Sequence, residues 1–131
     1  MRLVLQRITD RSSAGFPRRS RLLKHSDFQR VYQEAKKSFS GNITALYRAR
    51  TDQDLPGPRI GFAVGKVLGG AVARNRIRRR MRAAVASQLG SLTRPVDVVL
   101  HPRKSVLDLD FVKLSGEIQQ LFAAVQKGAG R

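Results

Sequence analysis

The chain has 131 residues, a length that fits one domain with a single core. Its 26 Lys and Arg residues outnumber 9 Asp and Glu residues, and the resulting net charge of +17 favours a polyanionic partner, which would relieve self-repulsion. Cysteine is absent and only His25 and His101 are histidines, which argues against disulfides, a thiolate nucleophile and a metal site built from several histidines. No apolar run is long enough to span a bilayer, residues 1–7 do not resemble a signal peptide, and we expect a cytoplasmic protein.

The first part of the chain predicts a basic extension and then a short helix. Residues 1–19 mix Arg, Ser, Gly and Pro without periodicity, which is typical of a disordered segment. A helix is expected over about 26–36, because Ser26 is a favourable N-cap and Asp27 suits the positive end of a helix. Apolar residues then recur at helical spacing: Phe28, Val31, Tyr32 and Ala35.

The middle of the chain predicts strands. Residues 43–50 and 59–65 have the composition of strands, and the Asp, Pro and Gly residues of 52–58 indicate a turn between them. A further short strand is possible at 37–39, and the apolar run 96–101 is typical of a buried strand.

An arginine-rich helix is predicted over about 71–89, following a loop that contains Gly65, Gly69 and Gly70. At about 100° per residue, one side of this helix gathers Ala73, Ile77, Met81, Ala84, Val85 and Gln88. The opposite arc carries Asn75, Arg76, Arg78, Arg79, Arg80 and Arg82. The last helix begins at Asp108 or Asp110, and its stripe of apolar residues predicts packing against the core. Helices and strands in this order indicate an α+β fold.

The arginine arc predicts contact with nucleic acid, because planar guanidinium groups bind phosphate oxygens in pairs and stack on exposed bases. A charged face that only meets solvent usually interleaves Glu with Lys or Arg, whereas no acidic residue occurs between Asp54 and Asp97. A solvated face and a run of the nuclear-localisation type are the alternatives at this point.

No catalytic constellation is found in the sequence. It lacks a nucleophile elbow and a phosphate-binding P-loop. Asp108 and Asp110 are better explained as a helix start than as a general acid and base. His101 fits a structural or phosphate-contacting role better than a catalytic one, since no second histidine lies nearby in the sequence.

Three aromatic residues suggest a groove for unstacked bases. Phe28 and Tyr32 lie one turn apart on the first helix, and Tyr47 lies on a strand together with Arg48 and Arg50. Rings and cations arranged in this way bind single-stranded nucleic acid. A core role is at least as good an interpretation for Phe28, whereas the hydroxyl groups of the two tyrosines favour a groove edge.

Four segments together closely resemble the bacterial ribonuclease P protein subunit. They are residues 21–32 (RLLKHSDFQRVY), 59–66 (RIGFAVGK), 70–82 (GAVARNRIRRRMR) and 96–100 (VDVVL). The resemblance covers about residues 20–125. It implies a ribonuclease P protein domain over 20–127 and a C-terminal tail over 128–131. The implied fold is a two-layer α+β sandwich in the order αβββαβα, with a mixed sheet of about four strands and a left-handed crossover around the arginine-rich helix.

The same resemblance implies an RNA-binding subunit that is not a nuclease by itself and that has no catalytic or metal-ligating side chains. Its partners would be a catalytic RNA, which uses Mg²⁺, and the precursor tRNA whose 5′ leader that RNA removes, with no membrane and no protein partner required. Contacts with the catalytic RNA are implied for Lys66, Arg74, Asn75, Arg76, Arg78, Arg79 and Arg82. A cleft for the leader is implied at Phe28, Tyr32 and Tyr47.

The chain departs from the family pattern at three places. Val67 and Gly70 replace a Lys and an Asn that the family often has, so the loop before the arginine-rich helix offers fewer contacts. At the end of the last strand, His101 and the two residues after it stand where the family usually has an arginine.

A ribosomal protein or ribosome-assembly factor is the alternative function, since it would share the charge and the lack of catalytic residues.

Overall fold

The computed structural model describes residues 15–51 and 57–130. Its helices are α3 (His25–Glu34), α4 (Ala71–Gln88) and α5 (Phe111–Ala129), and its strands are β1 (Lys36–Phe39), β2 (Ile43–Ala49), β3 (Arg59–Phe62) and β4 (Val96–Pro102). The predicted order of elements is confirmed, including the short strand β1. Most of the predicted turn at 52–58 and of the N-terminal extension lies outside the described residues.

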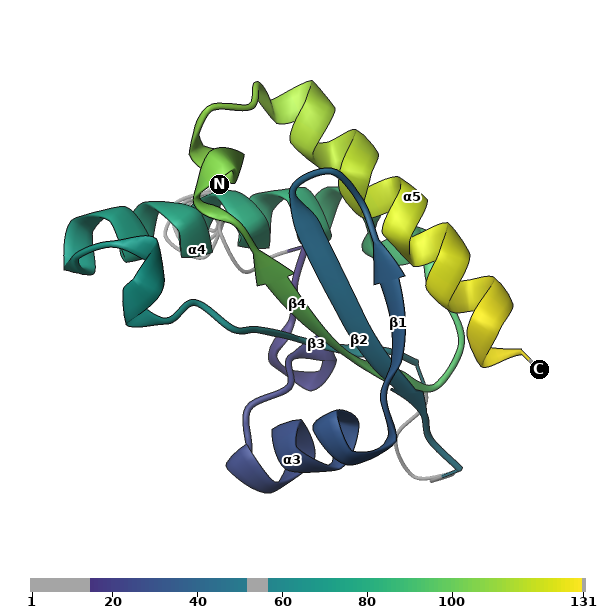
Figure 1. The fold of residues 1–131 in the computed structure, drawn as a ribbon. Helices are drawn as coiled ribbons and strands as arrows, with labels where there is room; N and C mark the ends of the chain where they lie inside the picture. The colour runs from purple at the N-terminus through teal and green to yellow at the C-terminus, as the bar shows by residue number, and fades with distance from the viewer. Residues whose placement is uncertain (1–14, 52–56, 131) are drawn as a thin grey trace, which may run out of the picture.

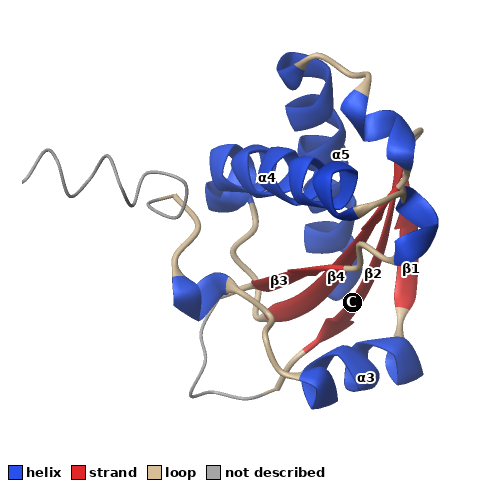
Figure 2. Ribbon diagram, turned by 90° about the vertical axis from the view of Figure 1, so that its left-hand side faces the viewer, coloured by secondary structure: helices blue, strands red, loops and turns tan. Residues whose placement is uncertain are grey.

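The four strands form one mixed sheet in the order β1-β2-β4-β3. Neighbouring pairs are antiparallel except β3 and β4, which are parallel. Helices α4 and α5 cover one face of the sheet, and α3 lies against the other face (Figure 1). In Figure 2, where the carboxyl ends of β3 and β4 point toward the viewer, the chain passes from β3 on the left over α4 above the sheet to β4 on the right. This is the left-handed crossover that the resemblance implied, which is rare in parallel units.

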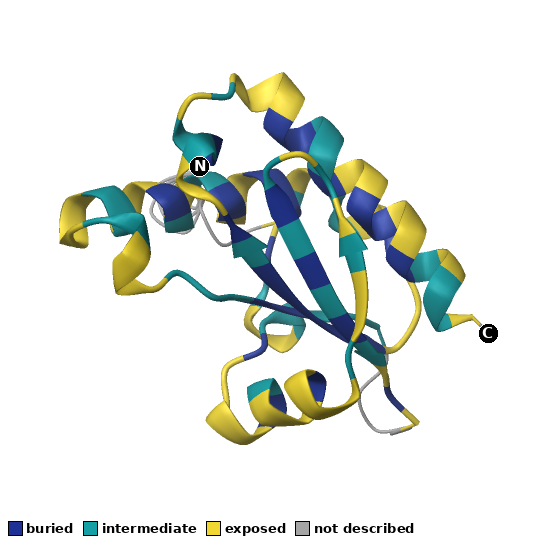
Figure 3. Cartoon of the chain, in the orientation of Figure 1, coloured by how far each residue is buried: buried dark blue, intermediate teal, exposed yellow. Residues whose placement is uncertain are grey.

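The main core lies between the sheet and the two long helices. It includes Ile77 and Met81 of α4, and Leu114, Ile118 and Phe122 of α5, all fully buried. Residues alternate along β2 between this core and the other face, whereas β4 is buried continuously from Val96 to Leu100, where helices cover both of its faces (Figure 3).

The start of α5 is as predicted from the sequence, whereas both ends of α3 differ from the prediction. Asp110 caps α5, since its Oδ1 accepts a hydrogen bond from the backbone N–H of Lys113 at 2.9 Å, as one of the two predicted starts required. Helix α3 begins at His25 with Lys24 as N-cap, so Ser26 is not the cap. It ends at Glu34, earlier than predicted, because Ala35 is extended and leads directly into β1.

The described residues before α3 belong to the folded domain, contrary to the predicted boundary at residue 20. Phe16 is only 1% exposed and packs edge-on against Phe62, with 5.9 Å between ring centroids. Leu22 then donates a backbone hydrogen bond to Ile60 of β3 at 2.9 Å, so the segment runs along the open edge of that strand. At the other end, α5 continues to Ala129, past the predicted end of the domain at residue 127.

Candidate nucleic-acid interface

Helix α4 presents its basic residues to solvent as the helical period predicts. Its apolar side is buried through Ile77, Met81, Ala84 and Val85. Asn75, Arg76, Arg79 and Arg82 are exposed on the outer side and Arg78 is half-buried at its margin. We call these five residues the arginine face. Lys66 is also exposed, in the short turn of 3₁₀ helix Lys66–Leu68 that precedes α4.

The arginine face contains a broad hollow of about 600 Å³ lined by Val72, Asn75, Arg78, Arg79 and Arg82. Arg78 is held in place by Asn75, whose Oδ1 accepts from Nη1 at 2.9 Å, and by the carbonyl of Val64 at 3.4 Å. No acidic side chain lines the hollow. Guanidinium groups that are positioned but not neutralised are suited to phosphate oxygens.

Two arginines of the helix do not lie on this face. The sequence pattern placed Arg80 on the outer arc, but its guanidinium donates to the carbonyl of Leu109 before α5, and the residue is half-buried. Arg74, which the resemblance assigned to RNA contact, is also half-buried, because the helical period turns it toward the side that carries Ile77 and Met81. Long stems of arginine cover apolar surface in this way.

On the other face of the sheet, three rings lie beside the part that α3 does not cover. The strand register aligns Phe39 of β1, Thr44 of β2 and His101 of β4 in one row. This row is on the face of α3, since Leu46 and Val99, two residues away along their strands, pack with Val31 of that helix. Tyr32 of α3 reaches His101, and we call Tyr32, Phe39 and His101 the aromatic platform.

The platform is open and uncharged. Phe39 is 68% exposed and Tyr32 is 45% exposed. The Tyr32 hydroxyl lies 3.3 Å from Nε2 of His101, and the two rings meet edge to face with centroids 5.7 Å apart. Burial lowers the pKa of His101 and raises the pKa of Tyr32, so both rings are neutral near pH 7. Neutral exposed rings are suited to stacking with bases.

Tyr47 does not lie on this platform, which corrects the predicted groove. It is 6% exposed and belongs to the main core with Ile43 and Ala45, on the opposite face of the sheet from Tyr32. Its hydroxyl packs against Gly128 near the end of α5. A Cβ at position 128 would lie only 2.0 Å from the hydroxyl oxygen, so no larger residue fits there. Phe28 is half-buried on the α3 face and packs with the smaller cluster around Val31.

Phe39 and His101 were not predicted as members of the site. Their position depends on the pairing register of three strands, which sequence spacing does not give. Alternation along each strand was the only available signal, and it leaves open which face each residue occupies.

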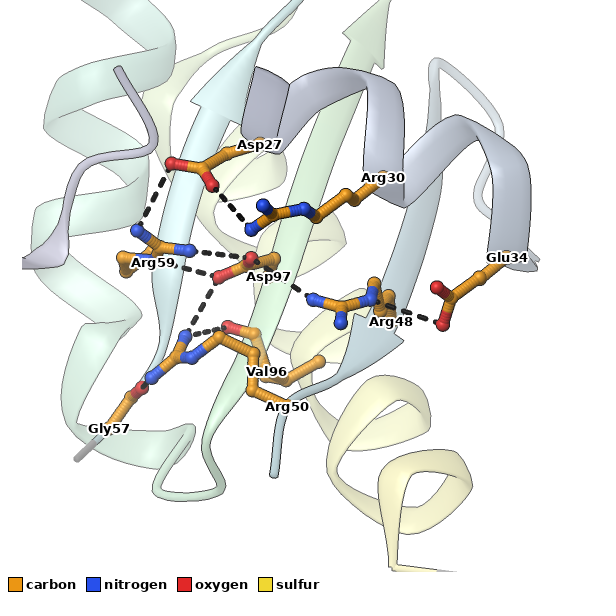
Figure 4. Close-up of polar contacts among 9 residues, drawn as sticks. All are labelled: Asp27, Arg30, Glu34, Arg48, Arg50, Gly57, Arg59, Val96 and Asp97. Atoms are coloured by element: carbon orange, nitrogen blue, oxygen red, sulfur yellow. Dashed lines mark hydrogen bonds and ion pairs between the residues drawn. The ribbon is translucent and has the colours of Figure 1, made fainter. Parts of the chain in front are cut away.

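Helix α3 is joined to the sheet by buried ion pairs (Figure 4). Asp97 of β4 is fully buried and pairs with Arg59 of β3 at 2.8 Å, and Arg59 also reaches Asp27 of α3 at 3.2 Å. The hydrogen bond with Asp97 raises the pKa of Arg59 although burial opposes it. The helix that carries Tyr32 is therefore oriented by its charged N-terminal turn.

Arg48 and Arg50 complete this network and do not form the cation row expected beside Tyr47. Arg50 is buried and donates from Nη1 to Asp97 at 2.7 Å. Arg48 lies 3.9 Å from Asp97 and donates to Glu34 of α3 at 3.1 Å. Asp97 thus gathers three arginines because charge buried in the interior requires pairing.

A second polar cluster fixes the turn between β1 and β2, next to Phe39. Both side-chain oxygens of Glu117 on α5 accept from Asn42, at 2.9 Å from its backbone and 2.5 Å from its side chain, and Oε1 also accepts from Ser40 at 2.5 Å. Burial acts to raise the pKa of Glu117, but the hydrogen bonds from Ser40 and Asn42 outweigh it and lower the pKa. The end of the platform at β1 is thereby attached to α5.

The part of the chain that the structure describes contains no group of three or more His, Cys, Asp or Glu side chains that fits a metal ion. Several carboxylates of these residues have other partners: Asp97 pairs with arginines, Asp110 accepts from the backbone of Lys113, and Glu117 accepts from Ser40 and Asn42. No helix among the described residues is long and apolar enough to cross a membrane.

The fold and the arginine face define a small α+β protein that binds nucleic acid. The sequence model of the family described as Ribonuclease P matches residues 16–126. The chain therefore belongs to the ribonuclease P protein family.

Relatives and solved structures agree with this membership. The ribonuclease P protein component of Acidothermus cellulolyticus is 37% identical over 105 residues, which cover 80% of this chain and 87% of the relative, and that of Bacillus velezensis is 36% identical over 107 residues, with coverage of 80% and 88%. The RNase P protein of Thermotoga maritima, solved with 1-(4-fluorophenyl)-2-thiourea, aligns with a TM-score of 0.68 at 25% identity over 78% of this chain and 96% of its own. The Staphylococcus aureus RNase P protein has the same fold, with a TM-score of 0.68 at 21% identity over 82% and 95%.

Proposed function

We propose that this protein is the RNA-binding subunit of a bacterial ribonuclease P, which removes the 5′ leader of precursor tRNA. The observation that carries the proposal is the pairing of two surfaces on a fold of this family: an arginine face without acidic residues, and a separate platform of exposed rings. A basic surface tracks phosphates, and exposed rings stack on unpaired bases. Both are needed by a protein that contacts a folded RNA and a single-stranded leader together.

We assign the arginine face to the catalytic RNA. Arg76, Arg79 and Arg82 are exposed on the outer side of α4, and Arg78 and Asn75 are already hydrogen-bonded to each other beside them. Lys66 extends this surface at the start of the helix. Arg74 is proposed only as a margin of the contact, since it is half-buried.

We assign the aromatic platform to the leader. Tyr32 and His101 offer two adjoining rings, and Phe39 offers a third in the same row of the sheet. Lys37, exposed two residues before Phe39 and on the same face, supplies a cation for the leader backbone. Phe28 supports the platform from the core of α3 rather than by stacking, and Tyr47 supports it from below the sheet. A ribosomal protein has no need of such a platform, and this favours the ribonuclease P assignment.

Catalysis is expected from the RNA subunit. No side chain of the described residues is proposed as nucleophile or base, and these residues do not fit a Mg²⁺ site. Mg²⁺ is therefore proposed to act with the RNA, where it would supply charge stabilisation for phosphodiester cleavage. With precursor tRNA and catalytic RNA as partners, the protein is expected in the cytoplasm.

The test is reconstitution. Purified protein is mixed with a bacterial ribonuclease P RNA and precursor tRNA at a Mg²⁺ concentration too low for the RNA alone, and release of the leader is measured. The expected result is cleavage that depends on both components, with none from the protein alone. Equal cleavage with and without the protein would overturn the proposal and favour the ribosomal alternative.

A further inference from the structure

A second binding site lies at the outer edge of β3, away from the aromatic platform. A cavity of about 210 Å³ is formed there between the segment that precedes α3, the strand β3 and helix α4. We call it the edge pocket. In the sheet order β1-β2-β4-β3, this edge is the one opposite to β1, which carries Phe39. Figure 2 shows the segment before α3 beside β3, with α4 above them.

The inner part of the edge pocket is aromatic. Phe16 and Phe62 meet edge to face at its side, and Phe28 contributes from α3. Phe28 lies directly on Gly61, where the Cβ of any other residue would be 2.5 Å from its Cζ. The cavity is smaller than the usual site for a drug-sized ligand, about 300–1,000 Å³, and much larger than the site for one water molecule. A single planar ring is the ligand suited to this size and lining.

The rim of the pocket is cationic. Arg21, Arg78 and Arg82 line it, and no acidic residue does. Arg21 is positioned by its Nε, which donates to the carbonyl of Phe16 at 3.0 Å, and by the ring of Phe16, whose centroid lies 5.4 Å from the guanidinium carbon. An aromatic interior with guanidinium groups at the mouth suits a base attached to a phosphate backbone.

The edge pocket joins two basic surfaces. Arg78 and Arg82 also line the hollow of the arginine face. On its other side, Arg21 and Leu23 also line a groove of about 470 Å³ whose remaining cations are Arg18, Arg19, Lys24 and Arg59. The only acid in that groove is Asp27, which is already paired with Arg59 and Arg30. A chain of phosphates would therefore meet cations without interruption from α4 to residue 18.

We propose that this track binds a single-stranded segment of the catalytic RNA, with one unstacked base inserted into the edge pocket. The phosphates on one side of that base contact Arg78 and Arg82, and those on the other side contact Arg21 and the groove beyond it. The catalytic RNA is the source because the track continues the arginine face, whereas the leader is assigned to Tyr32, Phe39 and His101, none of which lines the track. This inference rests on the proposed function.

The groove is tested by the salt dependence of binding. Arg18 and Arg19 are exposed, and replacing both with Ala is expected to lower the slope of log K against log salt for the catalytic RNA by about 1.5, near 0.7–0.9 per lost phosphate contact. The matched control replaces Lys113 and Lys127, exposed on α5, with Ala and removes the same charge. An equal slope change in both double variants would overturn the proposal.

The pocket is tested by site-directed cross-linking, for which the absence of cysteine is an advantage. Leu23→Cys, at a position 53% exposed that lines both the pocket and the groove, carries a short photo-cross-linker, and Val112→Cys, at a position 80% exposed on α5, is the control. The expected result is a cross-link from position 23 to unpaired nucleotides of the catalytic RNA in the holoenzyme. Cross-links to the leader instead, or none above the level of position 112, would overturn the proposal.

The same preparations separate this inference from the proposed function. Both labelled variants and the double variants are assayed for leader release with saturating catalytic RNA. If the wild-type protein does not activate the RNA, the proposed function has failed. If the wild-type protein does activate the RNA, the cross-linking and the salt slopes decide about the track. The track alone is wrong if the position-23 variant cross-links no better than its control and the groove variant has the same salt slope as its control.

Discussion

Arg59 donates two parallel hydrogen bonds to Asp97, from Nε to Oδ1 at 2.9 Å and from Nη2 to Oδ2 at 2.8 Å. The pair links the first residue of β3 to the second residue of β4, and Nη1, the remaining side-chain nitrogen of Arg59, donates to Asp27 of α3. Asp97 is fully buried, and through Arg59 it contributes to the orientation of α3 and so to the position of Tyr32.

Replacing Asp97 with Asn is expected to reduce the free energy of unfolding by about 3–5 kcal/mol, because it leaves buried guanidinium groups without a counter-charge. Denaturant titration measures the loss. Arg30→Ala is the control, since Arg30 is exposed and its 3.5 Å pair with Asp27 is expected to contribute no more than about 1 kcal/mol. Equal stability of the two variants would show that the network around Asp97 is not what holds α3.

The arginine face was predictable from the sequence because the helical period alone decides which residues of α4 lie outside. Arg80 escaped this rule, since its long stem bends toward Leu109, a tertiary contact that the period does not contain. The end of the predicted extension was misplaced for a related reason. Phe16 stands among Ser, Gly and Arg residues, and a single aromatic anchor leaves no periodic signal.

The platform was only half predictable. Tyr32 is identified by its place on a short amphipathic helix, whereas Phe39 and His101 become neighbours of that ring through strand pairing. Tyr47 was expected at a groove edge but lies in the main core, because the chemistry of a tyrosine fits either place. Asp97 gave no signal at all, since an acid within an apolar strand is explained only by the arginines that neighbouring strands bring to it.

Replacing Arg76 and Arg79 with Ala is expected to weaken binding of the catalytic RNA by a few kcal/mol and to lower the salt slope by about 1.5. Both side chains are exposed, so the unfolding midpoint should not change. Affinity is measured at several salt concentrations together with thermal unfolding. An unchanged slope would mean that this part of α4 is a solvated surface.

Glu117→Gln tests the contact that attaches the β1–β2 turn to α5. The lowered pKa means that this carboxylate stabilises the fold above its ordinary value of 4.5, and that the contribution is lost as pH falls through the lowered pKa. At pH 7 the variant should be less stable by about 1 kcal/mol, since the partly exposed site is screened by solvent. Denaturant titration at pH 7 and at acidic pH measures the free energy of unfolding with the Glu117 carboxylate ionised and with it protonated. The gap between wild type and variant should close on acidification, and a constant gap would contradict this role.

Tyr32→Ala, Phe39→Ala and Tyr47→Ala separate the platform from the core. If Tyr32 and Phe39 stack on leader bases, each replacement should weaken holoenzyme binding of precursor tRNA by about 1–3 kcal/mol and leave binding of mature tRNA almost unchanged, because mature tRNA has no leader. Phe39 is the sharper case, since at 68% exposure its loss should hardly affect the unfolding midpoint. Tyr47→Ala should instead reduce stability by about 3–5 kcal/mol, with both RNAs affected alike. Kd values for the two tRNAs are compared beside thermal unfolding of each variant. If Phe39→Ala weakens both RNAs equally, or neither, the leader does not cross this part of the sheet.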